Sequence, residues 1–225
     1  MLSLTSVYVG AALTHGSPLP PVLSSTRMFE WAKNNKCVLY LQDADGDENW
    51  HIYASDLATG VVRDMTPFQG IRAQGLELDQ NFPDEAMVEL NVRDRAAFDM
   101  YRLDLNTGAL VMYTENPGSV SQWICDKDFK IRGAIANDQA DGSKILKVRD
   151  SDSSAWRDIA RWPSDETANF YRFTPDGAGV YVGTSMAHGT GDAKDTTRLV
   201  VGAHVTAHAH GPIIFVIFCR DYKAL

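Results

Sequence analysis

The stretch IYASDLATG at residues 52–60 returns as MYRLDLNTG at residues 100–108, and this repetition decides the fold class. Tyr53 and Tyr101 stand at the same place in the two copies, so the period is 48 positions (101 − 53 = 48). A fixed period of about 40 to 50 residues built from short strands is typical of a β-propeller, with one four-stranded blade per repeat. The sequence therefore predicts an all-β chain that forms a partial β-propeller.

The predicted second strand of each repeat can be followed along the chain. These runs are short, rich in β-branched and aromatic residues and bounded by turn formers, as half-buried antiparallel strands are. They lie at residues 37–41, 86–90, 131–135 and 180–182. About four four-stranded antiparallel blades are therefore expected between residues 26 and 203. Their expected bounds are residues 26–69, 70–117, 118–163 and 164–203.

The two ends depart from the repeat. Residues 1–25 are expected to form an irregular leader; the first 24 contain no Lys or Arg, so the positive region of a secretory signal is missing. Residues 204–225 form a divergent tail with seven consecutive apolar residues after Pro212. Seven are too few to cross a bilayer, which takes about 20 in a helix. A buried strand at residues 213–218 is expected instead.

Composition narrows the class of partner and compartment. The chain has 225 residues and a formal net charge of -8, and such an acidic balance argues against nucleic acid as a partner. Its three cysteines are odd in number and widely spaced, which predicts neither a disulfide framework nor a zinc knuckle. We therefore expect a cytoplasmic protein that has no membrane segment and needs no cofactor.

Several segments resemble one enzyme family. VLYLQDADGDENWHIY at residues 38–53, DLATG at 56–60 and DMTPF at 64–68 look like the propeller of prolyl oligopeptidase-type (S9) serine peptidases. The likeness is greatest to their acylaminoacyl-peptidase and dipeptidyl-aminopeptidase branch. Weaker matches follow in family order at residues 101–108, 115–118 and 195–200, so the resemblance covers residues 26–201.

This resemblance implies a two-part enzyme. In the family, a propeller of about seven blades screens peptides for an α/β-hydrolase domain with a Ser-Asp-His triad. The triad needs a Gly-x-Ser-x-Gly elbow with its partners, and this chain shows none. We therefore expect no catalytic residue in this chain, no activity of the chain alone, and a catalytic domain that is absent from it. Its expected partners are a peptide substrate or the hydrolase domain.

A second interpretation, from another class, stays open: a free-standing propeller that binds a protein or peptide on its rim. Ring closure distinguishes the two, because a free module must pair its first and last blades whereas a fragment leaves strand edges open. The sequence favours open edges, and exposed edges are templates for pairing. Self-association through open blade edges is therefore expected.

Two segments have sequence patterns that resemble a catalytic site or a metal site. Ser185 in GTSMA (residues 183–187), followed by HGTG (188–191), looks like a degenerate nucleophile elbow. The repeat places it in a hairpin loop, however, so we expect no catalytic role. His204, His208 and His210 have spacings that zinc accepts, but no acidic or cysteine partner lies near in sequence, so no metal site is expected.

The candidate binding residues lie in DADGDEN at residues 43–49. This is no EF-hand, because the positions that require Gly and Glu hold Glu48 and Ala54. A hairpin turn with carboxylates in solvent is expected. Asp47 and Glu48 are nevertheless the candidates for binding a substrate's amino terminus, since paired carboxylates suit an ammonium ion. The five tryptophans are expected to pack between sheets.

Overall fold

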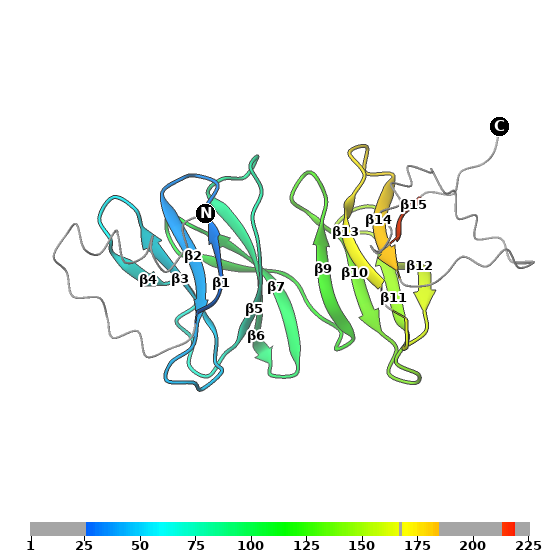
Figure 1. Ribbon diagram of the computed structural model, residues 1–225, viewed down its shortest axis with the longest axis horizontal. Coiled ribbons are helices and arrows are strands. Elements are labelled where there is room, and N and C mark those ends of the chain that lie inside the picture. The colour runs from blue at the N-terminus through cyan, green and yellow to red at the C-terminus, as the bar shows by residue number, and fades with distance from the viewer. Residues whose placement is uncertain (1–25, 167, 185–212, 219–225) are drawn as a thin grey trace, which may run out of the picture. The chain divides into compact units, whose positions relative to one another are not determined.

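The computed structural model describes residues 26–166, 168–184 and 213–218 (Figure 1). These residues form antiparallel sheets: three with four strands and one with three. Within these ranges there is no helix, and so none that could cross a membrane. The chain divides into two compact units, Met1–Gly118 and Ser119–Leu225, which are described separately. The predicted all-β, blade-type architecture is confirmed.

The first unit contains two sheets with their strands in chain order. The first sheet consists of β1 (Thr26–Trp31), β2 (Cys37–Gln42), β3 (His51–Asp56) and β4 (Val62–Asp64). The second consists of β5 (Ala73–Glu77), β6 (Glu85–Asp94), β7 (Ala97–Asp104) and β8 (Leu110–Thr114). Each sheet thus repeats the same meander, as a period of 48 residues requires.

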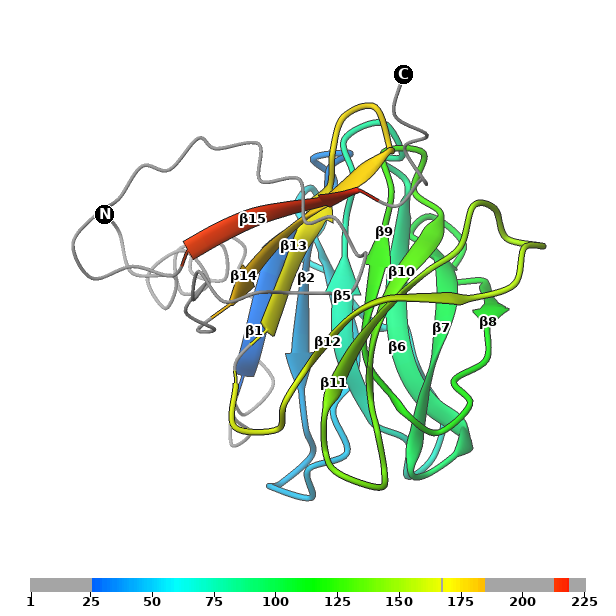
Figure 2. The same cartoon turned by 90° about the vertical axis from the view of Figure 1, so that its right-hand side faces the viewer.

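The second unit contains the other two sheets. One consists of β9 (Val120–Cys125), β10 (Ile131–Asn137), β11 (Lys144–Val148) and β12 (Arg157–Trp162). The other consists of β13 (Ala168–Phe173), β14 (Gly179–Thr184) and β15 (Ile213–Phe218). Figure 2 shows β15, in red, beside β14, with which it pairs along its whole length. The strand expected at residues 213–218 is therefore present, and it belongs to the fourth sheet.

The repeated motif is a turn between the third and fourth strands. Asp56 Oδ1 accepts hydrogen bonds from the Thr59 N–H (2.8 Å) and from the Thr59 hydroxyl (2.8 Å). The N–H of Gly60 then closes the turn on the Asp56 carbonyl, with a positive φ of 72° that glycine adopts without a steric penalty. The motif thus has a structural role in linking neighbouring strands.

The core of the first unit lies between its two sheets. Successive side chains of a strand point to opposite faces, and Leu39, Leu41, Ile52 and Ala54 all point to one face of the first sheet. They pack against apolar side chains of the second sheet and are at most 4% exposed. The side chains from the second sheet include Ala86, Val88, Leu90, Leu103 and Leu105.

The second unit is built in the same way around an aliphatic and aromatic core. Leu146 and Val148 pack with Phe173 and Val180 of the fourth sheet. A Cβ on Gly133 would lie 3.2 Å from Ile124 Cβ and 3.3 Å from Phe173, so glycine allows the close approach of these side chains.

One expectation about the tryptophans is wrong. Trp50, Trp123 and Trp162 are buried, as expected, but the side chain of Trp31 is 44% exposed. Trp31 lies on β1, at the edge of its sheet, and opposite Val38 it points away from the face that carries Leu39 and Leu41. Trp31 therefore lies on the face of the first sheet that does not form the core of the first unit.

Candidate functional site

The candidate binding residues lie in the hairpin that joins β2 to β3. Because the strands are antiparallel, this hairpin lies at the opposite end of the sheet from the Asp56–Gly60 turn. Asp43 at its base is only 4% exposed, and its Oδ2 accepts a hydrogen bond from the Glu48 N–H (3.4 Å). The base of the hairpin is thus fixed by a buried carboxylate.

Asp47 stabilises the hairpin itself. Its Oδ1 accepts the Asn49 N–H (3.0 Å) and the Ala44 N–H (3.3 Å), and its Oδ2 accepts Asn49 Nδ2 (2.9 Å). The hydrogen bonds from Asn49, its side chain first, lower the pKa of Asp47, with a smaller contribution from the charge of His51. Asp47 is therefore ionised at neutral pH while its oxygens are engaged in the turn.

Glu48 is the member of the pair whose carboxylate takes no part in the turn. Its carboxylate has no hydrogen-bond or ion-pair partner among the residues that the structure describes. Its φ is +57°, a left-handed conformation that costs a residue with a Cβ about 1–2 kcal/mol. Asp45 and Gly46 also have positive φ, so the tight turn imposes this conformation. The hairpin thus holds two carboxylates, those of Asp45 and Glu48, unpaired in solvent at a cost in backbone energy.

The other end of the first unit has a pocket of about 390 Å³ with both polar and apolar lining residues. Lys36 Nζ lies 3.4 Å from Asp84 Oδ1 and 3.2 Å from Asn106 Oδ1, and Arg63 donates to the carbonyls of Leu105 (3.0 Å) and Asn106 (3.2 Å). These contacts all join the first sheet to the second. The polar groups of the pocket therefore act mainly in connecting the two sheets.

Cys37 also lines this pocket. Burial is the main cause that raises the pKa of its thiol, and the neighbouring Asp56 carboxylate raises it further. A protonated thiol is a poor nucleophile, so the pocket contains no activated cysteine.

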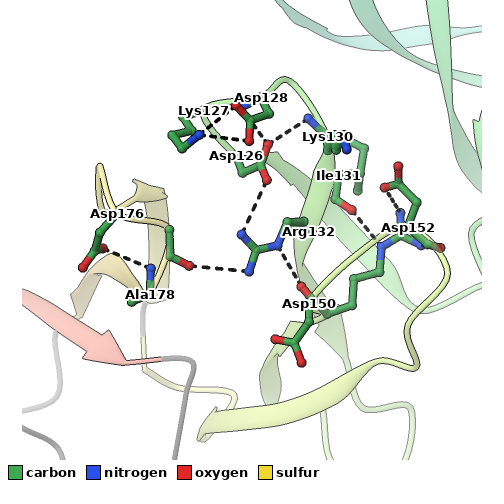
Figure 3. A network of polar contacts seen from close by, with 12 residues as sticks. Asp126, Lys127, Asp128, Lys130, Ile131, Arg132, Asp150, Asp152, Asp176 and Ala178 are labelled. Carbon is green, nitrogen blue, oxygen red and sulfur yellow. Dashed lines mark hydrogen bonds and ion pairs between the residues drawn. The ribbon is translucent and has the colours of Figure 1, made fainter. Parts of the chain in front are cut away.

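In the second unit, a polar network surrounds Arg132 (Figure 3). The guanidinium donates from Nε to the carbonyl of Arg149 (3.0 Å) and reaches Asp126 Oδ2 and the carbonyl of Gly177, both at 3.5 Å. It also lies over the ring of Phe173, at 5.1 Å from its centroid. Asp126 accepts the backbone N–H groups of Asp128 (2.9 Å) and Lys130 (3.0 Å). The network connects turns of the third and fourth sheets, and no motif in the sequence indicates it.

The structure leaves some sequence-based candidates untested. Ser185, His204, His208 and His210 lie outside the described residues. Within the described ranges, no three His, Cys, Asp or Glu side chains are grouped so that they could hold a metal ion. The hairpin with Asp47 and Glu48 lies within the described residues, and its role in binding stays a prediction.

Comparison with known proteins gives one close relative by sequence. No family model matches the chain. Dipeptidyl aminopeptidase BIII of Pseudoxanthomonas mexicana is 30% identical over 166 residues, which are 73% of this chain and 24% of that protein. The chain thus spans about a quarter of the length of this relative.

Solved structures with similar folds share little sequence. TolB from Acinetobacter baumannii aligns over 75% of this chain and 39% of its own, at 16% identity and a TM-score of 0.49. The β-propeller domain of the Trilobed protease from Pyrococcus furiosus aligns over 71% and 48%, at 11% identity and a TM-score of 0.46. Oligopeptidase B from Leishmania major aligns over 72% and 24%, at 8% identity and a TM-score of 0.47.

Proposed function

Because this chain is related through its blades to the dipeptidyl aminopeptidases of the prolyl oligopeptidase (S9) family, we propose that it serves as the propeller part of an S9-type serine peptidase. In this function it screens peptide substrates for an α/β-hydrolase domain. The observation that carries the proposal is the 30% identity to dipeptidyl aminopeptidase BIII over 166 residues. None of the described residues is assigned a role in bond cleavage.

Glu48 is proposed as the residue that attracts the substrate's amino terminus. Its exposed and unpaired carboxylate suits an ammonium ion, and the left-handed backbone keeps it on the hairpin surface. Asp47 has a different role in this proposal, because its oxygens are bound to Ala44 and Asn49. It holds the hairpin in shape and adds a fixed negative charge beside Glu48.

The role of Glu48 can be tested on the chain itself. Binding of a short peptide with a free amino terminus would be compared with binding of the same peptide after N-acetylation, by NMR titration. We expect Glu48→Gln to weaken only the binding of the free-amine peptide, while Glu30→Gln, on the neighbouring strand β1, serves as the matched control. Equal affinity of the wild type for both peptides would contradict this role.

The wider function has a separate test, a full-length transcript read through the locus. A message that encodes further blades and a Gly-x-Ser-x-Gly domain would support the peptidase proposal. A message that stops after Leu225 would contradict it and favour the free-standing interaction module. The two tests are independent, because the transcript does not depend on the peptide affinity of Glu48.

A further inference from the structure

Two equivalent hairpins of the first unit differ in charge. A shift of 48 positions carries DADGDEN at residues 43–49 to NVRDRAA at residues 91–97. Both segments join the second strand of a sheet to the third, β2 to β3 and β6 to β7. The first contains four carboxylates and no Lys or Arg, whereas the second contains Arg93, Arg95 and one carboxylate, Asp94. We call them the acidic hairpin and the basic hairpin.

Hydrogen bonds place Arg72 between these hairpins. The carbonyl of Trp50, just after the acidic hairpin, accepts the N–H of Ala73 (2.7 Å). On the other side, the N–H of Arg72 donates to Asn91 Oδ1 (2.6 Å), and Asn91 Nδ2 donates to the Arg95 carbonyl (3.3 Å). The segment that enters β5 is therefore bonded both to the end of the acidic hairpin and to the basic hairpin.

The guanidinium of Arg72 has a buried donor without an acceptor. Its Nε is buried and makes no hydrogen bond, and the guanidinium forms no ion pair with any residue that the structure describes. Two other buried atoms without a hydrogen bond, Glu85 Oε2 and Arg102 Nε, belong to one ion pair with a separation of 3.4 Å. Because buried polar groups are almost always paired, the unused donor of Arg72 indicates an acceptor that a ligand supplies.

Arg95 adds a second positive charge beside Arg72. Its guanidinium donates to the carbonyls of Gly70 and Gln69, which hold it on the loop that leads to Arg72. These acceptors are neutral, and Arg95 forms no ion pair within the described ranges. A guanidinium has five N–H donors, so Arg95 keeps donors for a further acceptor.

The other charges of the basic hairpin are engaged. Arg93 donates to both oxygens of Asp99 (2.9 and 2.8 Å), so its charge is neutralised. Asp94 Oδ1 accepts the N–H of Ala96 in its own turn (2.9 Å) and keeps its negative charge. The guanidinium groups of Arg72 and Arg95 together exceed this charge by one, which matches a singly charged carboxylate.

A short peptide with two free ends fits this arrangement. Arginine binds carboxylates through paired N–H donors, and the unpaired carboxylates of the acidic hairpin suit an ammonium ion. Sheets that pack face to face lie about 10 Å apart. An extended chain of about three residues covers this distance, at roughly 3.3–3.6 Å per residue. A polyphosphate, in contrast, would be repelled by the acidic hairpin and by the net charge of -8.

We propose that Arg72 and Arg95 bind the C-terminal carboxylate of a peptide of about three residues, whose amino terminus lies at Glu48. This inference rests on the proposed peptide-binding function and names its substrate class, which is short peptides with both ends free. The carboxyl end of a longer peptide extends past Arg72, so longer peptides lose this contact.

The test is an NMR titration of the full chain with trialanine in three forms: free, N-acetylated and C-amidated. Amidation is expected to raise the dissociation constant about five-fold, because it removes the charge that the two arginines bind. The Nε–H signal of Arg72 is expected to shift with both peptides that keep the carboxylate and much less with the amide. An amidated peptide that binds as tightly as the free one would overturn the proposal.

Arg72→Gln and Arg95→Gln are each expected to remove the preference for the free carboxylate, and thermal unfolding would verify that each variant is folded. Lys33→Gln is the matched control, because it removes the same charge from the turn between β1 and β2, at the opposite end of the first sheet. Lys33 has no hydrogen bond or ion pair among the described residues. An equal loss of preference in this control would mean that net charge alone decides, and would overturn the proposal.

The two blocked peptides distinguish failure of this inference from failure of the proposed function. If acetylation weakens binding and amidation does not, the role of Glu48 is supported and that of the arginines is refuted. If only amidation weakens binding, the arginines are supported and Glu48 is refuted. A wild type that binds none of the peptides contradicts both. Inorganic phosphate that binds as tightly as trialanine would indicate a general anion site and would overturn the assignment to peptides.

Discussion

Asp56 and Asp104 lie one repeat apart, and each Oδ1 accepts the backbone N–H of the threonine three residues later at 2.8 Å. In both turns the following glycine has a positive φ, 72° at Gly60 and 79° at Gly108. The same geometry at two sites explains why these residues are repeated. Asp and Gly are required by the turn itself.

Gly60→Ala and Gly108→Ala are therefore expected to destabilise the protein by similar amounts. A Cβ at Gly60 would meet no atom within 4 Å, and at Gly108 it would meet only Met65 Cε at 3.8 Å. The cost of the left-handed backbone, about 1–2 kcal/mol, is partly offset because alanine reduces the freedom of the unfolded chain, so urea unfolding should show a net loss of roughly 0.5–1 kcal/mol. Gly60→Asn is the control, because asparagine tolerates this conformation better. An alanine variant as stable as the wild type would refute the argument.

Glu48→Gly is expected to separate stability from binding. It removes the strain of φ +57° but increases the freedom of the unfolded chain, for a net stabilisation of roughly 0.5–1 kcal/mol. The proposal for the substrate's amino terminus predicts weaker peptide binding in the same variant. Urea unfolding and peptide titration measure the two effects. A variant that is less stable than the wild type would show that the hairpin does not strain Glu48.

Acid is expected to destabilise the second unit through Asp141. Hydrogen bonds from Ser143, backbone first, and then from Arg161 lower the pKa of Asp141 to about 2 from 3.8. Because the folded pKa lies below the unfolded one, the stabilisation is complete above about pH 5 and is lost as the pH falls from about 4 to 2. Asp141→Asn should flatten the dependence of the thermal midpoint on pH over this range. An unchanged slope would exclude Asp141 as a contributor.

Arg132→Gln is expected to destabilise the second unit by about 1–3 kcal/mol. It removes the cation beside Asp126, whose side chain is 4% exposed, and the contact with the Phe173 ring. Hydrogen exchange should show reduced protection in the Asp126–Lys130 turn. Lys130→Gln is a suitable control, because its backbone N–H, rather than its side chain, contacts Asp126. An equal loss of hydrogen-exchange protection in both variants would contradict a specific role of Arg132.

Cys37 is expected to react slowly with thiol reagents in the folded protein. Burial and the nearby Asp56 carboxylate raise the pKa of its thiol, which lowers the fraction of thiolate. Mass spectrometry after iodoacetamide treatment should find Cys37 modified only after unfolding in urea. Rapid modification in native buffer would show that the pocket exposes an activated thiol.

The all-β fold with blade-like sheets could be predicted because the repeat and the strand pattern are visible in the sequence, whereas the place of β15 in the fourth sheet could not, since residues 213–218 lie outside the range expected for that blade. The predicted second strands correspond to β2, β6, β10 and β14. It could not predict the exposure of Trp31, because a tryptophan in a strand reads the same on either face until the register is known. The Arg132 network joins residues far apart in sequence, and its partners include backbone carbonyls, which leave no pattern in side-chain types.

The candidate site was predicted only in part. The sequence DADGDEN predicts a turn with several carboxylates. Which carboxylate stabilises the turn and which stays unpaired depends on which oxygen accepts which N–H group. The Asp47 carboxylate accepts hydrogen bonds from Asn49 and Ala44, whereas the Glu48 carboxylate is unpaired among the described residues. The positive φ of Glu48, shared with Asp45 and Gly46, follows from the closure of the whole hairpin, and a glutamate in the sequence does not signal it.

The two sheets of the first unit use corresponding strand registers, and equivalent faces recur after 48 residues. Within the first unit, a further copy of the second repeat would therefore present a face of the kind that the first sheet already packs against. A change by any other length would disturb the turns and the alternation of faces. Changes of length in the first unit are thus expected to be tolerated best in steps of 48 residues, whether they arise by gene duplication or by engineering.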